Sequence, residues 1–286
     1  MKAKQVPPAW AAAHKRSARR LLLTEARSAI RLRTAARQVH HELLGQLQTT
    51  GGQAAALVAL KAARERMAAT VAAQIVETRR KARLAALETV NDELNLLSKQ
   101  LSAMGFKSVA FGKPVLGPQE NPEDVASADA VSHSLAAHWA QTVLALLVAM
   151  GSDADVTIEV RARTVMQRLD HRIVRIATTE SARAYSGQHD DTVENLLEPH
   201  HEAKWVMAVF HYWSALLDRS VCTECRAHDG DIRPIGLAFD GDTPGDMHPN
   251  CRCTDGLLLL PAKLESEEPD ADEEFAAEHP EEDAAQ

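Results

Sequence analysis

The sequence has few aromatic residues and few of the residues that end helices. Only 4% of its 286 residues are aromatic, and it holds 13 glycines and 12 prolines, whereas apolar residues in total make up 45%. Ordinary apolar content with so few aromatic residues favours helices over a β-sandwich. The length allows one large domain or two small ones, each with a sizeable core.

Long apolar runs and a leader segment are also missing. The longest apolar run, around residues 143–150, is far shorter than the roughly 20 residues that cross a membrane. The first 20 residues hold no apolar stretch ahead of their basic cluster, so we expect no signal peptide. We therefore expect a protein that is made and kept in a reducing cytoplasm and has no membrane partner.

Charge is unevenly distributed along the chain. Residues 1–110 carry 19 Lys and Arg against seven Asp and Glu, a net charge of +12. Residues 111–260 have a net charge of −10, and residues 261–286 carry one Lys against 11 acids, again −10. This asymmetry predicts a basic N-terminal region and an acidic tail, which we expect to be disordered.

The first half of the sequence predicts two long helices. Residues 9–48 form the first, residues 49–52 break it, and residues 53–104 form the second. Four arginines fall within about 60° of one another on the first helix: Arg16, Arg20, Arg27 and Arg31. This stripe is either a weak DNA-binding surface or a solvated face with snorkelling arginines.

A seven-residue repeat of leucine occurs in the second helix. Leu87, Leu94 and Leu101 form one row, and Val90, Leu97 and Met104 form the matching offset row. Two such rows make a seam that packs against a neighbouring helix or a partner protein.

The second half predicts an α+β domain. Glycines and prolines in residues 109–122 mark a linker, and residues 123–260 form the domain, with a helix to residue 150 and another from 156 that Gly187 ends. Residues 204–213 favour a strand, with a helix as the alternative. Residues 226–239 favour a hairpin that turns at Asp229-Gly230. The predicted fold is thus mainly helical up to residue 108, followed by an α+β domain whose small β-element is stapled by zinc.

All four cysteines lie in the segment 218–256, in a Cys-x-x-Cys and a Cys-x-Cys. Two close pairs of thiols, with a histidine nearby, supply the tetrahedral ligands that Zn²⁺ takes in structural sites. The predicted ligands are Cys222, Cys225, Cys251 and Cys253, with His248 as the alternate fourth. Two disulfides and four free thiols are the alternatives; a thioredoxin-type redox site is disfavoured because no βαβ pattern surrounds the pair.

The same residues resemble a known family. The order is Asp218-Arg219 before the Cys-x-x-Cys, then Asp229-Gly230, then the hexapeptide His-Pro-Asn-Cys-Arg-Cys at 248–253. Upstream, Thr179-Glu180-x-x-Arg183-Ala184 is similar to a helix of that family. Together they resemble the phage Mu protein F family of minor head, or head-morphogenesis, proteins, over about residues 160–256. The resemblance implies a few-copy virion protein, in the capsid interior or at the portal vertex, that contacts portal or capsid proteins during head assembly or DNA packaging.

Two other classes of function compete with this interpretation. A metal-dependent hydrolase or toxin-like enzyme would keep one zinc position open for water, with Glu224 or Asp246 as general base. The chain has no nucleophile elbow, P-loop or His-Glu-x-x-His motif, so we name no catalytic residue. A zinc-ribbon DNA reader is disfavoured, because residues 218–256 hold four Arg against eight acids and would repel phosphate.

Overall fold

The computed structural model describes most of the chain. The described residues are 6–50, 52–107, 109–116, 122–150, 158–215, 222–237, 239, 244–245, 247–248 and 251–261. The predicted disordered tail, apart from Pro261, lies outside them.

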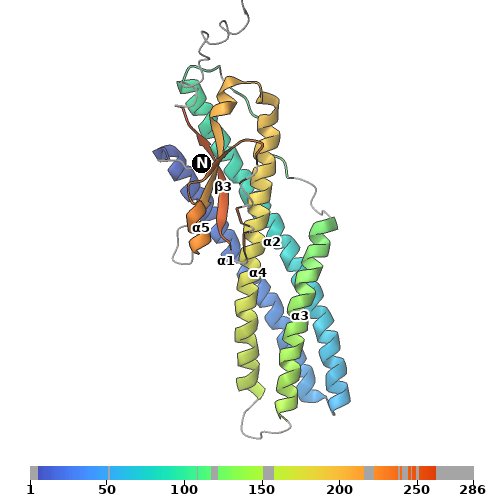
Figure 1. Ribbon diagram of the computed structural model, residues 1–286. Helices are drawn as coiled ribbons and strands as arrows, with labels where there is room; N and C mark the ends of the chain where they lie inside the picture. Colours follow the sequence, from blue (N-terminus) through green and yellow to red (C-terminus); the bar gives the residue numbers. More distant parts are fainter. Residues whose placement is uncertain are drawn as a thin grey trace, which may run out of the picture.

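Four long helices form an elongated bundle (Figure 1). They are α1 (Pro8–Thr49), α2 (Gln53–Ala103), α3 (Pro122–Met150) and α4 (Ile158–Leu197). The ends of α1 and α2 confirm the predicted helices to within one residue. The chain breaks between them at Gly52, which adopts a φ of 89° that residues with a side chain avoid. α3 begins at Pro122, a residue suited to the first turn of a helix.

The prediction that Gly187 ends a helix is wrong, because α4 continues for ten more residues to Leu197. Glycine inside a helix lowers the stability of the helix by about 1 kcal/mol relative to alanine. The burial of neighbouring side chains on the same helix can outweigh this loss. Tyr185 and His189, on either side of Gly187, are both fully buried, so tertiary contacts hold the helix through the glycine.

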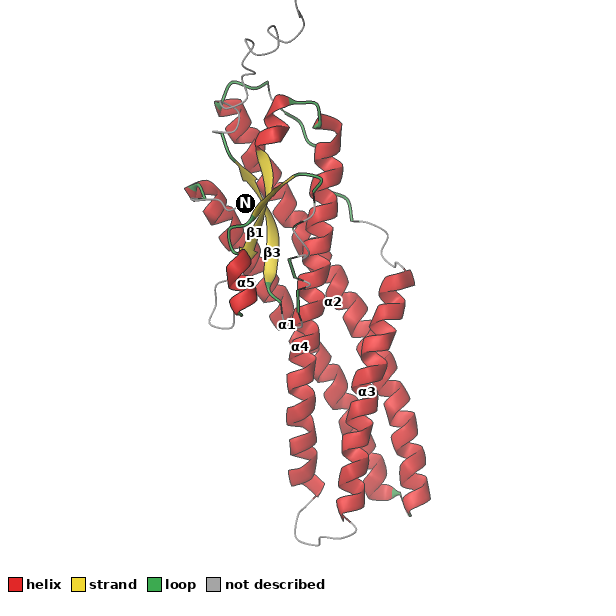
Figure 2. Ribbon diagram, viewed as in Figure 1, coloured by secondary structure: helices red, strands yellow, loops and turns green. Residues whose placement is uncertain are grey.

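A three-stranded antiparallel sheet lies against the bundle (Figure 2). Its order is β2 (Ile232–Pro234), β1 (Val209–Ala215) and β3 (Cys253–Leu259), with β1 in the centre. The prediction of a strand over 204–213 is correct only from Val209, where β1 starts. Lys204–Ala208 forms a 3₁₀ helix, η2. A second short 3₁₀ helix, η1 (Glu198–His200), follows α4.

The predicted hairpin over 226–239 is wrong in its first arm. Residues Thr223–His228 form a short helix, α5, which the turn at Asp229-Gly230 connects to β2. β2 pairs with β1 rather than with residues 223–228. The aromatic and branched residues that indicated a strand are concentrated in β1, which therefore becomes the partner of both neighbours.

Two main apolar clusters hold these elements together. One fills the bundle between α1, α2, α3 and α4 at the end away from the sheet, around Leu43, Met67 and Trp139. The other packs the sheet against α1, α2 and α4, around Trp10, Leu97 and Leu258. α1 and α2 therefore contribute to both clusters, and α1 is a core helix as well as a basic one.

The leucine seam of α2 faces this second cluster. Leu94 is 4% exposed, and Leu97 and Leu101 are fully buried. Most of the seam therefore packs inside the protein, as the neighbouring-helix alternative predicted, whereas Leu87 is partly buried and Met104 is 39% exposed.

One segment of α3 deserves comparison with a membrane span. Val125–Val148 is long and apolar enough to cross a membrane by length and composition, although its uninterrupted apolar run, at residues 143–148, is short. A core helix meets the same criterion, and Leu135, Trp139 and Val143 of this segment are buried in the protein. This single helix is no clear signal of a membrane protein.

The observed fold is therefore mostly helical with a small antiparallel sheet towards its C-terminal end. The predicted linker at 109–122 separates α2 from α3 in sequence, but helices on both sides of it pack against each other. The division into domains stays a prediction.

Candidate metal centre

The cysteines and His248 come from three places in the chain. Cys222 caps the N-terminus of α5, where its sulfur accepts a hydrogen bond from the backbone N–H of Cys225 over 3.2 Å. Cys225 lies in the first turn of α5, and Cys253 is the first residue of β3. The short helix and the sheet thus bring the two cysteine pairs to one point.

The side chains of these residues are in mutual contact. Nε2 of His248 lies 3.1 Å from Sγ of Cys222 and 3.0 Å from Sγ of Cys225. Sγ of Cys225 lies 3.8 Å from Sγ of Cys251. Two triads, Cys222/Cys225/His248 and Cys225/Cys251/Cys253, share Cys225, and the atoms of each lie within 4.8 Å of one another.

This geometry fits a tetrahedral ion. With zinc–sulfur bonds of about 2.3 Å, two sulfurs on a tetrahedron lie about 3.8 Å apart. The Cys225–Cys251 distance has this value. All four cysteines are free thiols, so the structure does not adopt the two-disulfide alternative.

The environment of the cluster separates the pKa values of the thiols. A hydrogen bond with Cys253 lowers the pKa of Cys251 to about 5, whereas burial raises the pKa of Cys225 to about 12. The hydrogen bond with Cys251, with burial, raises the pKa of Cys253, while the backbone N–H of Cys225 lowers that of Cys222. Crowded thiols do not ionise together unless a cation offsets their charge.

The cluster is closed in by packing. Cys225, Cys251 and Cys253 form one apolar cluster with Trp213 and Ala215 of β1. Gly245 has a φ of 86°, and a Cβ there would lie 2.8 Å from the backbone oxygen of Ala182 in α4. Glycine thus lets the segment before His248 lie directly against α4.

A second group of polar residues lies buried between the sheet and the helices, and the sequence analysis did not find it. His211 of β1 is fully buried, and its Nδ1 lies 2.6 Å from Oδ2 of Asp255 of β3. His189 of α4, also fully buried, donates from Nε2 to Oε2 of Glu93 of α2 over 2.6 Å. These four residues come from separate elements, and no local motif links them.

Arg233 of β2 joins this network through contacts with three carboxylates. Its guanidinium contacts Asp190 and donates to Glu194 over 3.3 Å, and Nη2 lies 3.6 Å from Oδ2 of Asp255. Asp190, Glu194 and His211 have a spacing that suits a metal ion. The arginine already supplies a positive charge to both carboxylates, so we interpret the network as structural.

Opposite pKa shifts follow from these contacts. Burial alone would raise the pKa of Asp255, but His211, His189 and Arg233 outweigh it, and the pKa falls well below the usual range of an aspartate. Burial and the charge of Asp255 raise the pKa of Asp190 to about 6. Burial would lower the pKa of His189, but Glu93 raises it above its ordinary value. The contacts of the network therefore favour the charged forms of Asp255 and His189.

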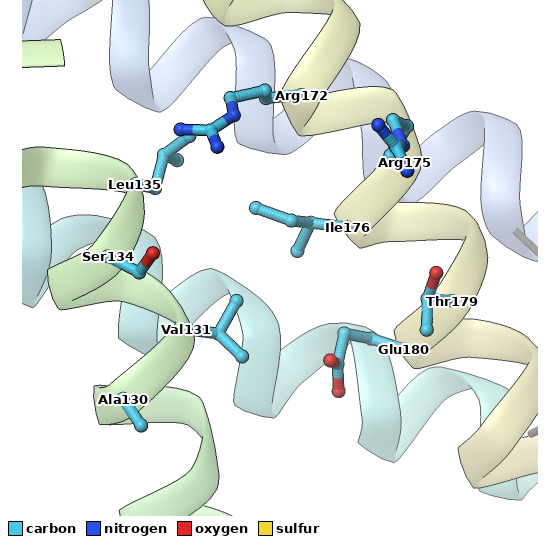
Figure 3. A pocket seen from close by; sticks show the side chains of 9 residues that line it. All are labelled: Ala130, Val131, Ser134, Leu135, Arg172, Arg175, Ile176, Thr179 and Glu180. Atoms are coloured by element: carbon cyan, nitrogen blue, oxygen red, sulfur yellow. The ribbon is translucent and has the colours of Figure 1, made fainter. Parts of the chain in front are cut away.

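The segment with Thr179 and Glu180 borders a cavity of about 520 Å³ between α3 and α4 (Figure 3). Glu180 is 4% exposed and forms an ion pair with Arg79 of α2 at 2.5 Å, so its side chain lies in the interior of the protein. A carboxylate paired in this way holds α4 against α2. Nothing in this pairing makes Glu180 a general base.

Of the two general bases considered for the enzyme alternative, Glu224 lies among the described residues. Glu224 is exposed in the first turn of α5, and Asp246 lies outside the described residues.

The described residues define a helical protein with a small sheet and a Cys/His cluster. The model of the family described as Phage Mu protein F like protein matches residues 141–255 of the chain. No curated protein and no solved structure matches it. The match extends from the end of α3 to β3 and includes the whole cluster.

The resemblance inferred from the Thr-Glu segment and the closing hexapeptide is thereby confirmed, and residues 141–255 form a phage Mu protein F-like region. This is a family of phage head morphogenesis, which suggests a structural role, association with the virion and contact with other head proteins.

Proposed function

We propose that this chain is a minor head protein of a tailed phage, held at the portal vertex or the inner capsid, and acts in head assembly or DNA packaging. The family match over residues 141–255 carries this proposal. The closed cluster and the paired state of Glu180 support a structural role over chemical turnover.

We propose that the Cys/His cluster holds one structural Zn²⁺. Cys222, Cys225 and Cys251 would supply three ligands, and Cys253 or His248 the fourth. The ion would join the start of α5 to the start of β3 and offset the thiolate charge. Metal binding of this kind contributes directly to folding free energy.

The assembly role predicts that the chain binds a head protein encoded with it. We expect the full-length tagged chain, co-expressed with the portal protein encoded beside it, to retain that portal on an affinity column. An unrelated phage portal is the control. We also expect peptides of this chain in purified heads at a few copies per particle, measured by quantitative mass spectrometry. Absence from both the portal complex and the heads would overturn the assignment.

A basic pocket between α1 and α2 supports DNA contact by the N-terminal region. This cavity, of about 440 Å³, is lined by Arg20, Arg27 and Arg31 of α1 and by Lys81 of α2, with Glu88 on the same wall. Arg27 is exposed and makes no hydrogen bond or ion pair with the residues that the structure describes. The arginine stripe thus includes three residues that share a pocket with a lysine from another helix. We propose that the pocket binds the phosphates of nucleic acid.

Neutralising two cations of the pocket should weaken DNA binding in a salt-dependent way. Each phosphate contact contributes a slope of about −0.9 when log affinity is plotted against log salt, so Arg27→Gln with Lys81→Gln should reduce the slope by about 2. Fluorescence anisotropy with a short duplex measures it. The matched control is Arg19→Gln with Lys99→Gln, which removes two exposed cations outside the pocket. Equal losses in both double variants would show that net charge, not the pocket, binds DNA.

A further inference from the structure

The basic pocket has a candidate occupant within its own chain. The pocket holds four cations against Glu88, whereas residues 262–286 hold 11 acidic residues against Lys263. Nine of these acids lie in residues 268–283. Opposite charges on one chain meet at a high effective concentration, because their encounter is intramolecular.

The distances allow this contact. β3 runs beside α1: His14 donates to the backbone oxygen of Leu257 over 2.9 Å, and Nε of Arg252 lies 3.3 Å from Oε2 of Glu25. β3 therefore ends near the start of α1, and a helix rise of about 1.5 Å per residue puts Arg27 about 20 Å from His14. An extended chain spans about 3.3 Å per residue, so the acids of 268–283, which lie 7–22 residues beyond Pro261, can reach about 23–70 Å.

Most cations of the pocket have room for a further partner. Arg20 contacts Asp92 at 2.7 Å and Lys81 contacts Glu77 at 3.5 Å, both on the protein surface where water screens the pairs. Arg31 donates to the neutral hydroxyl of Ser28. These contacts leave Arg27, which is exposed, and Arg31, which is partly buried, without a carboxylate partner among the described residues.

We propose that the acidic segment 268–283 binds in the basic pocket of its own chain and competes there with nucleic acid. The competition rests on the proposed DNA contact, whereas the binding of the acidic segment does not. The bound segment would keep the pocket from binding nucleic acid indiscriminately before assembly. A longer polyanion, present at high local concentration in a filling head, would displace it.

Zero-length cross-linking of the full-length chain tests this directly. A carbodiimide joins a carboxylate to a lysine amine in contact with it, so peptides from 262–286 should be joined to Lys81. The matched control is Lys99, also on α2 and 18 residues closer to the end of that helix, near the sheet. We expect at least about fivefold more links to Lys81 than to Lys99 at low salt, and a similar loss of Lys81 links in 0.5 M salt, as expected for a screened contact.

One variant and one isotope-mixing experiment give two further tests of this contact. Arg27→Gln should reduce the Lys81 links severalfold, and a mixture of isotopically light and heavy protein should give links within one isotope only. The proposal would be overturned if Lys99 formed as many links as Lys81, if the Lys81 links did not decrease in high salt, or if most links joined light to heavy protein.

A DNA-binding measurement separates this proposal from the previous one. In the full chain, amides replacing all 11 acidic residues of 262–286 should raise DNA affinity about tenfold or more at low salt. DNA binding without Lys81 links, and without this gain, overturns the docking of the acidic segment alone. Lys81 links without any DNA binding overturn the proposed DNA contact and leave the docking in place.

Discussion

Cys251→Ser is expected to release the metal and melt the sheet region while the helices away from it persist. Cys251 is fully buried, and its sulfur contacts Cys225 at the centre of the cluster. Both candidate ligand sets contain Cys251, so its loss breaks either set, and the folding free energy of a structural zinc site, about 10–16 kcal/mol in small zinc peptides, depends on the complete set. Zinc per chain should fall from about one to near zero by elemental analysis.

The rest of the bundle should survive this change. The cluster around Leu43, Met67 and Trp139 does not include the sheet, so most helical circular dichroism should remain after a first, lower-temperature transition. Thr223→Ser, an exposed neighbour of Cys222, is the control. His248→Ala and Cys253→Ser identify the fourth ligand, because only the true ligand should reduce zinc content. A wild-type protein that is free of metal after gentle purification and melts unchanged with chelator would refute the zinc site.

Asp255→Asn is expected to lower the free energy of unfolding by about 3–5 kcal/mol, the usual effect of breaking a buried ion pair. Asp255 is 2% exposed and lies 2.6 Å from His211, which is fully buried, so the amide would leave the histidine and Arg233 without their shared carboxylate. Urea unfolding at pH 7 measures the change. Asp231→Asn is the matched control, since Asp231 forms a half-exposed pair with His228 at 2.9 Å and should cost less than about 1 kcal/mol.

The effect of Asp255→Asn should depend on pH in a defined direction. The folded protein holds the pKa of Asp255 below its unfolded value, so the contribution of its charge is present above the unfolded pKa of about 3.9. The contribution decreases as the pH falls below that value towards the folded pKa. The difference between wild type and variant should therefore be constant from about pH 5 to 6 and shrink towards pH 3. A difference that grows on acidification would contradict the ion pair.

The prediction from sequence succeeded where the signal is local. Periodic apolar residues and breaks at Gly52 and Pro122 located three of the helices, since helix ends depend on nearby residues. The spacing of the cysteines placed five side chains in one cluster, because short loops keep such pairs close together.

The prediction failed where distant residues decide. Gly187 by itself disfavours a helix, yet α4 continues beyond it because Tyr185 and His189 are buried in tertiary contacts. Residues 223–228 form a helix rather than a hairpin arm, because β1 already takes β2 and β3 as its partners. No local pattern indicates that Glu180 is buried, because Arg79, which pairs with it in the interior, is 101 residues away.

By itself, the sequence determined the long helices, the convergence of cysteines and histidine, and the relation to phage head proteins, because each depends on residue types at short spacing. Tertiary structure alone decided that most of the leucine seam is internal, that Lys81 joins the arginines of α1, and that His211, Asp255, His189 and Glu93 form one buried network. Their elements meet only when the sheet packs onto α1, α2 and α4. A buried charge in that interface is stable only when a residue of opposite charge from another element pairs with it, and no local pattern in the sequence predicts which residue that is.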